Sequence, residues 1–278
     1  MTTTAATTIT APSVSGAPPS DSLPSTLRWA VSDTFTITKR NLIALTRIPE
    51  ALFFSAVQPI MFVLLFVYVF GGAIKTPGSS YVNYLMPGVF VQTVAFGAVS
   101  TSIGLAEDLQ KGLIERFRAL PMARSAVLVG RTTADVARNI AVVVIVTVVG
   151  LMVGFRPTTG VVPYVAGVLL ILLFAYGLSW GFAFIGLSAS NAETAQVMSF
   201  PILFPLVFVS SAFVPLNQMP SWMQGFATYQ PFSVTITACR ALMTGGPTAT
   251  WVIQSLAWTL GFLVVLVPLA SWRYRTRT

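Results

Sequence analysis

Charge is scarce in this sequence. Charged residues make up 9% of the 278 positions, whereas hydrophobic residues make up 55%. A soluble domain usually carries about 25% charged residues, because charge covers much of its surface. This chain has too little charge to form such a surface. The composition predicts an all-α membrane protein whose outer surface faces lipid and which crosses the bilayer several times.

Histidine is absent, and Cys239 is the single cysteine. A disulfide within the chain is therefore excluded, and so is a metal site built from Cys and His. The sequence also shows no cluster of acids or thiols that suits a nucleophile or a metal. We therefore expect no catalytic residue, no metal site and no cofactor in this chain.

Lysine is rare as well, with Lys39, Lys75 and Lys111 as its three occurrences. A P-loop ends in Gly-Lys-Ser/Thr, so that the lysine reaches the nucleotide phosphates. Here the residues before the lysines are Thr, Ile and Gln. None of the three lysines belongs to a P-loop, and any ATPase that works with this chain must be another polypeptide.

Carboxylates are few, and they avoid the apolar runs. Ion-driven carriers usually place acidic groups inside their spans, where ions need polar partners. All eight acids here fall in expected tails, connectors or span ends, with Asp135 the deepest: Asp21, Asp33, Glu50, Glu107, Asp108, Glu115, Asp135 and Glu193. This distribution argues against coupling to protons or sodium.

What the chain has in abundance is apolar sequence. A helix needs about 20 mostly apolar residues to cross a bilayer. Six such runs lie at roughly residues 51–74, 84–106, 125–155, 162–189, 195–214 and 251–272. Residues 215–250 contain four prolines and are too broken to span. We expect them to form a re-entrant or interfacial outer segment with one or two short helices.

The basic residues are distributed unevenly between the two faces that six spans create. Thirteen of the sixteen fall on the face that holds both termini, leaving Lys75, Arg156 and Arg240 on the other. Cytoplasmic loops collect Lys and Arg. The pattern predicts a multi-pass protein of the plasma membrane with both termini in the cytoplasm.

The N-terminal part divides into two segments. Residues 1–25 are mostly Thr, Ser, Pro and Ala, which predicts a disordered tail, and residues 26–278 form a single transmembrane domain. In residues 26–48, Leu27, Val31 and Phe35 share one helical face with Leu42 and Leu45. This face predicts an interfacial helix, either as a plain lipid anchor or as an anchor that also docks a partner.

Residues 107–120 combine charge with an apolar stripe. At about 100° per residue, Leu109, Leu113, Phe117 and Leu120 share a face, and charged residues occupy the other side. Pro121 ends the pattern. A charged cytoplasmic helix between two spans is suited to dock another protein and to pass force into the membrane.

Two stretches resemble a known family. They are "EDLQKGLIERFRALPMARSAVLVGRTTADVARN" at residues 107–139 and "VPLNQMPSWMQGFATYQPFSVTITACRALMTGGP" at residues 214–247. With the order of the expected elements, they resemble the type-2 permeases of ABC exporters, nearest to the daunorubicin-resistance-type drug efflux permeases of actinobacteria. Many family members have Asn-Pro where this chain has Gln230-Pro231.

The resemblance implies partners and a role. The chain would be the membrane half of an ATP-driven bacterial exporter of a hydrophobic drug, antibiotic or lipid-like natural product. It would form a homodimer above two cytoplasmic ATPase subunits that bind ATP and Mg, without nucleic acid. The alternative is a proton-coupled multidrug carrier. The coupling helix would use Glu107, Asp108, Lys111, Leu113, Glu115, Arg116, Phe117 and Arg118.

The resemblance also implies that the first, second and fifth spans line the substrate pathway. Aromatic rings and amides in these spans suit a planar, amphipathic molecule: Phe54, Gln58, Phe90, Gln92, Phe96, Phe204 and Phe208. Helix packing also explains each phenylalanine. Gln58 and Gln92 are the stronger candidates, because a buried amide needs a hydrogen-bond partner, although they too can serve to join helices.

Overall fold

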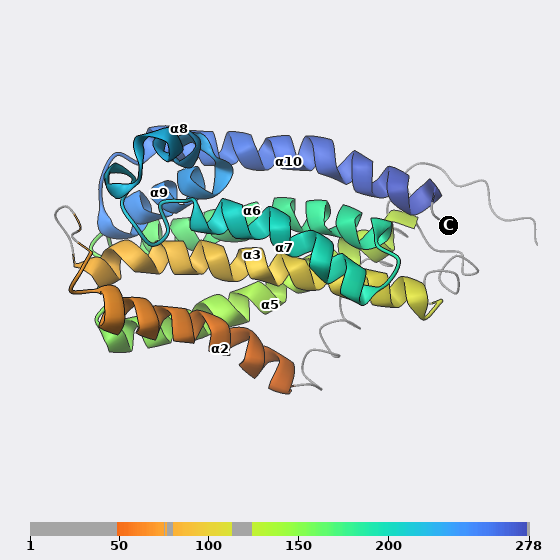
Figure 1. Ribbon diagram of the computed structural model, residues 1–278, viewed down its shortest axis with the longest axis horizontal. Coiled ribbons are helices and arrows are strands. Elements are labelled where there is room, and N and C mark those ends of the chain that lie inside the picture. The colour runs from red at the N-terminus through yellow and green to blue at the C-terminus, as the bar shows by residue number, and fades with distance from the viewer. Residues whose placement is uncertain (1–48, 75, 77–79, 113–123, 277–278) are drawn as a thin grey trace, which may run out of the picture.

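A computed structural model describes residues 49–74, 76, 80–112 and 124–276, excluding the side chains of residues 49–54 and 124–127. Every regular element in these ranges is helical, which confirms the predicted all-α class for this part of the chain (Figure 1). The predicted tail at residues 1–25, the interfacial helix at residues 26–48 and residues 113–120 of the coupling helix lie outside the described residues.

Four helices are long and apolar enough to cross a membrane: α3 (Tyr81–Gln110), α5 (Arg124–Val153), α6 (Val161–Ser188) and α10 (Ala249–Thr276). They correspond to the second, third, fourth and sixth predicted spans. Their long apolar runs explain why the sequence located them to within a few residues.

The first and fifth predicted spans form shorter helices. α2 (Pro49–Leu65) contains Pro59 and continues as a π-helical turn over Phe66–Phe70. α7 (Ala192–Phe208) contains Pro201 and Pro205, and it ends before the predicted boundary at residue 214. Seventeen helical residues rise about 25 Å, somewhat less than the roughly 30 Å hydrocarbon core. A count of six spans therefore stays a prediction.

The long helices lie side by side, with α3, α6 and α10 running in one direction and α5 in the opposite direction (Figure 1). The end of α3, the start of α5, the α6–α7 turn and the end of α10 gather at one end of the bundle, which we call the charged end. Asp108, Lys111 and Arg273 belong to this end, whereas Arg156 and Arg240 belong to segments at the opposite end. The described basic residues therefore show the asymmetry that the sequence predicts.

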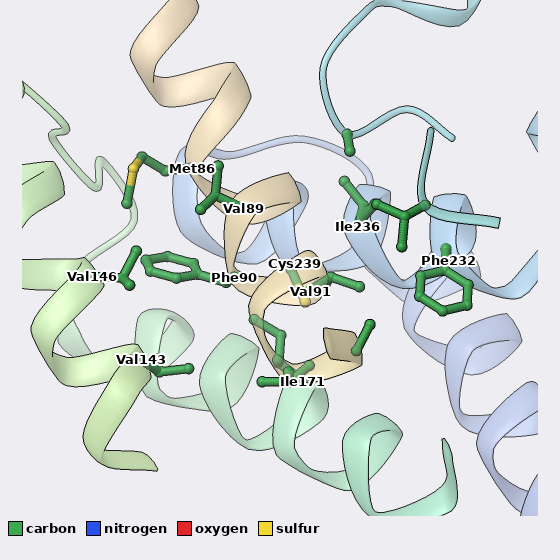
Figure 2. Close-up of a cluster of buried hydrophobic side chains, with 14 of the residues drawn as sticks. Met86, Val89, Phe90, Val91, Val143, Val146, Ile171, Phe232, Ile236 and Cys239 are labelled. Carbon is green, nitrogen blue, oxygen red and sulfur yellow. The ribbon is translucent and has the colours of Figure 1, made fainter. Parts of the chain in front are cut away.

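Helix α3 occupies the centre of the bundle, and most of its residues from Tyr81 to Ala106 are buried. Figure 2 shows Phe90 of α3 directed at Val146 of α5, with Ile171 of α6 and Cys239 of α9 in the same apolar cluster. At Gly186 of α6, an added Cβ would collide with the backbone of Ser102 in α3. Such a close approach needs a small residue at the contact.

Residues 215–250 contain two short helices, as expected. A 3₁₀ turn (Leu216–Gln218) leads into α8 (Ser221–Tyr229), which exposes Trp222 and Tyr229. α9 (Pro231–Thr244) is instead buried against α3, α6 and α10. Helix α9 is therefore part of the bundle core, while α8 covers its surface.

Candidate functional site

A polar seam joins α3 to α5. We define the α3–α5 seam by Gly97 and Gly104 on α3 and by Arg138 and Arg131 on α5. A Cβ at Gly97 would collide with Asn139 Oδ1 at 2.6 Å and lie 3.2 Å from Arg138 Nη2, and one at Gly104 would collide with the guanidinium of Arg131. Glycine thus makes room for polar side chains of α5 at two levels, which are seven residues apart along each helix.

Each arginine of the seam has an acidic partner. Arg131 Nη1 lies 2.5 Å from Asp108 Oδ2, and Arg138 Nη2 lies 3.4 Å from Asp135 Oδ1. Arg138 Nη2 also donates to the Gly97 carbonyl oxygen at 2.6 Å, and Thr101 Oγ1 donates to Asp135 Oδ2 at 2.5 Å. Burying a charge is costly unless the charge is paired and hydrogen-bonded. Both arginines are paired, although Arg131 Nε is buried without a hydrogen-bond partner among the described residues.

Asp135 lies deeper than the sequence suggested. It was expected near the start of a span, but it lies eleven residues into α5 and is 8% exposed. Asp135 and Arg138 stand one helical turn apart, and this spacing of three is the sequence signal that predicts an internal ion pair. The buried carboxylate is already engaged by Thr101 and Arg138, so it is not an isolated acid.

The predicted coupling residues divide at the end of α3. Glu107 and Asp108 lie in the last turn of α3 and do not begin a separate helix. Glu107 forms an exposed ion pair with Lys111 at 3.1 Å, whereas Asp108 is occupied by Arg131. The other five lie outside the described residues: Leu113, Glu115, Arg116, Phe117 and Arg118.

Three predicted pathway residues meet at one cavity. Gln58 of α2 and Gln92 and Phe96 of α3 line a cavity of about 100 Å³ at the α3–α5 seam, which we call the seam pocket. The rest of its wall consists of Ser55, Pro59, Thr93, Gly97, Ser100, Arg138, Asn139 and Val142. The pocket therefore combines amides, hydroxyls and one guanidinium with a single aromatic ring.

The remaining pathway candidates lie elsewhere. Phe204 and Phe208 of α7 stack with ring centroids 4.3 Å apart, and Phe204 is 51% exposed. Phe90 does not join them, because α3 is buried around its circumference at this level and Phe90 packs edge-on against Phe155 at 6.2 Å. The side chain of Phe54 lies outside the description.

An aromatic row that the sequence reasoning missed connects α2 to α7. Phe208 continues into Phe213 at 5.4 Å, and Phe213 stacks on Phe66 at 4.4 Å. Phe62 lies 5.9 Å from Phe66. The spacing of four between Phe62 and Phe66 places both rings on one face of a helix, and this was the available signal. The row brings α2 and α7 together.

Comparisons with known proteins show what this chain is similar to. Residues 32–244 match the ABC-2 type transporter family. The chain is 36% identical over 248 residues to the daunorubicin resistance ABC transporter permease protein DrrB1 of Streptomyces coeruleorubidus, covering 89% of this chain and 88% of that protein. It is 28% identical over 254 residues to the probable doxorubicin resistance ABC transporter permease protein DrrC of Mycobacterium tuberculosis, covering 90% and 91%.

Proposed function

Because this chain belongs to the ABC-2 type transporter family, we propose that it is the membrane-spanning permease subunit of an ATP-driven exporter. The cargo we propose is a hydrophobic drug, antibiotic or lipid-like natural product that leaves a bacterial cell. The similarity that carries this proposal extends over about nine tenths of the chain to proteins named as drug resistance permeases. Multi-pass membrane insertion agrees with the four long apolar helices.

The proposed assembly contains two permeases and two ATPase subunits. A separate ATPase is needed because no lysine of this chain belongs to a P-loop. We place the ATPase at the charged end, in the cytoplasm with both termini, where Glu107 and Lys111 are exposed. A second copy would cover apolar side chains on α2 and α7, of which Met61 and Phe204 are more than half exposed.

The α3–α5 seam supports a route for force in this assembly. Arg131 and Asp108 tie α5 to the last turn of α3, next to the segment proposed to dock the ATPase. Arg138 ties the same two helices at the level of the seam pocket. A displacement at the charged end would therefore move α3 and α5 together, with little shift of one helix relative to the other, and would reach the seam pocket.

The test is reconstitution of the full chain with its partner ABC ATPase subunit. We expect ATP hydrolysis to be required for drug transport into inside-out vesicles. Glu115→Arg should reduce co-purification of the ATPase while leaving the unfolding temperature unchanged. Asn217→Arg, an exposed charge change at the opposite end, is the matched control and should co-purify normally. Equal ATPase recovery from Glu115→Arg and wild type would contradict the docking role.

A proton-coupled multidrug carrier remains the second candidate, and Asp135 is the observation that favours it. A buried carboxylate within an apolar helix is a common element of proton pathways. An imposed proton gradient should drive transport by the isolated chain if this candidate is correct, and Asp135→Asn should abolish it. Transport that needs ATP and its ATPase, and ignores the gradient, selects the exporter.

A further inference from the structure

We infer that the seam pocket is a subsite for a neutral oxygen-bearing group, such as a carbonyl beside a hydroxyl, on a larger apolar ligand. The inference deepens the proposed function, on which it rests, by naming the chemical feature that the permease recognises. Its physical basis is a side-chain amide that is buried without a hydrogen-bond partner in the described part of the chain.

Gln92 is that amide. Its side chain is 3% exposed, and neither Oε1 nor Nε2 has a hydrogen-bond partner in the described structure. Buried polar side chains almost always have partners, and an exception needs an explanation. Gln230, equally buried at 4%, shows the ordinary case, because its Nε2 donates to the Leu206 carbonyl at 2.9 Å and its Oε1 accepts from the Phe232 amide at 3.1 Å.

The charge in the pocket favours a neutral group over an anion. Arg138 lines the pocket, but its charge is balanced by Asp135. Its guanidinium has five N–H donors, so it can serve a carbonyl in addition to its present partners. Gln92 offers one donor group and one acceptor, which suits a ligand that both accepts and donates. A carbonyl next to a hydroxyl presents this combination.

The size of the pocket limits what can enter. Pockets that hold whole drug-sized molecules measure about 300–1,000 Å³, whereas the seam pocket measures about 100 Å³. It therefore accepts a polar substituent of a few atoms, and the apolar body of the ligand must remain outside.

The open side of the pocket can support such a body. Gln58 and Ser100 are exposed at this side, whereas Gln92 and Asn139 form the buried wall. Phe96 also lines the pocket, and its ring lies 6.1 Å from that of Phe200 on α7. The two rings are tilted by 54°, so a planar ligand can lie on the face of one ring while its oxygen-bearing edge reaches Gln92.

The test measures binding to the full chain in lipid nanodiscs, without ATPase and without ATP. The probes are 1,4-dihydroxyanthraquinone, which carries adjacent carbonyl and hydroxyl groups, and anthracene, which has a similar ring system without oxygen. We expect the quinone to bind wild type about tenfold more tightly than it binds Gln92→Leu. Anthracene should bind both proteins equally and weakly, after subtraction of empty nanodiscs.

Gln254→Leu is the matched control, because it makes the same substitution on α10, at a residue that does not line the seam pocket. It should bind the quinone like wild type. The unliganded Gln92→Leu protein should unfold at the same temperature as wild type or higher, since the change removes an unpartnered amide. A lower unfolding temperature, an unchanged quinone affinity in Gln92→Leu, or equal affinity of wild type for both probes overturns the inference.

These outcomes are separate from those of the exporter test. A negative binding result leaves ATP-dependent transport to be judged by its own reconstitution. Transport that ignores ATP would overturn the exporter proposal and leave a positive probe result at Gln92 in place.

Discussion

The guanidinium of Arg240 lies 3.6 Å from the centre of the Tyr84 ring and donates a hydrogen bond to the Tyr84 carbonyl oxygen at 3.1 Å. It also donates to the Ser211 carbonyl oxygen at 2.7 Å, which accepts the Tyr84 hydroxyl at 3.1 Å. One cation thus holds α9, α3 and the segment after α7 together. Among the described residues, no carboxylate forms an ion pair with it.

Arg240→Lys should lower the free energy of unfolding by about 2–3 kcal/mol, because an ammonium group cannot lie flat on the ring while reaching both carbonyls. Tyr84→Phe is the control, since it keeps the ring and loses one hydrogen bond, at a cost of about 1 kcal/mol. Thermal unfolding followed by tryptophan fluorescence measures both. Equal unfolding temperatures for Arg240→Lys and wild type would show that the contacts of Arg240 with Tyr84 and Ser211 contribute nothing to stability.

Asp135→Leu should be strongly destabilising, by about 3–5 kcal/mol, because it leaves the guanidinium of Arg138 buried with one carbonyl as its partner. The double variant Asp135→Leu/Arg138→Met should recover much of this loss, since it removes both charges. A double-mutant cycle on unfolding temperature measures the coupling. Additive effects of the two single changes would contradict the pairing.

Gly186→Ala and Gly261→Ala make the same change in two different environments. The first places a methyl group against the backbone of Ser102, so α3 and α6 must separate, at about 1–3 kcal/mol. The second meets no atom within 4 Å and should raise stability by up to about 1 kcal/mol through helix propensity. Thermal unfolding compares them directly, and equal shifts would refute the close helix contact.

Cys239 should resist maleimide labelling in the native protein, because its side chain is fully buried among α3, α6 and α9. Labelling should reach one thiol per chain only after denaturation in SDS. Ser221→Cys provides the control, since this exposed position at the start of α8 should add one reactive thiol under native conditions. Rapid native labelling of the wild-type chain would show that α9 is more open than described.

The sequence predicted some elements better than others, for physical reasons. α6, expected at residues 162–189, spans Val161–Ser188, because a long apolar run with polar flanks allows few alternatives. α7 ends at Phe208, although the apolar pattern continues to residue 214. Side-chain hydroxyls cause this break, since Ser210 and Ser233 accept the backbone amides of Ala212 and Ser211. Hydropathy does not contain that information.

The candidate site was predictable only in part. Gln58, Gln92 and Phe96 line one pocket. The two glutamines could be predicted, because polar side chains in apolar helices tend to face other helices and not lipid. Phe90 lies in the apolar core and not at this pocket, and the sequence could not indicate this, because a helix buried on every side shows no apolar stripe that distinguishes its faces. The contact of Arg138 with α3 was missed for a different reason: the Gly97 carbonyl reaches its guanidinium only once α3 and α5 are packed.

The paired arginines restrict how the bundle can change shape. Pulling α5 away from α3 would break the Arg131–Asp108 ion pair and the hydrogen bond from Arg138 to the Gly97 carbonyl, so we expect these helices to move together. A change in shape must therefore involve other helices. α2 and α7 contain prolines, which remove helical hydrogen bonds, and they meet through phenylalanine rings, which can slide past one another without exposing a charge. The α3–α5 pair is thus the rigid part of the bundle, and we expect relative movement to cost least between α2 and α7.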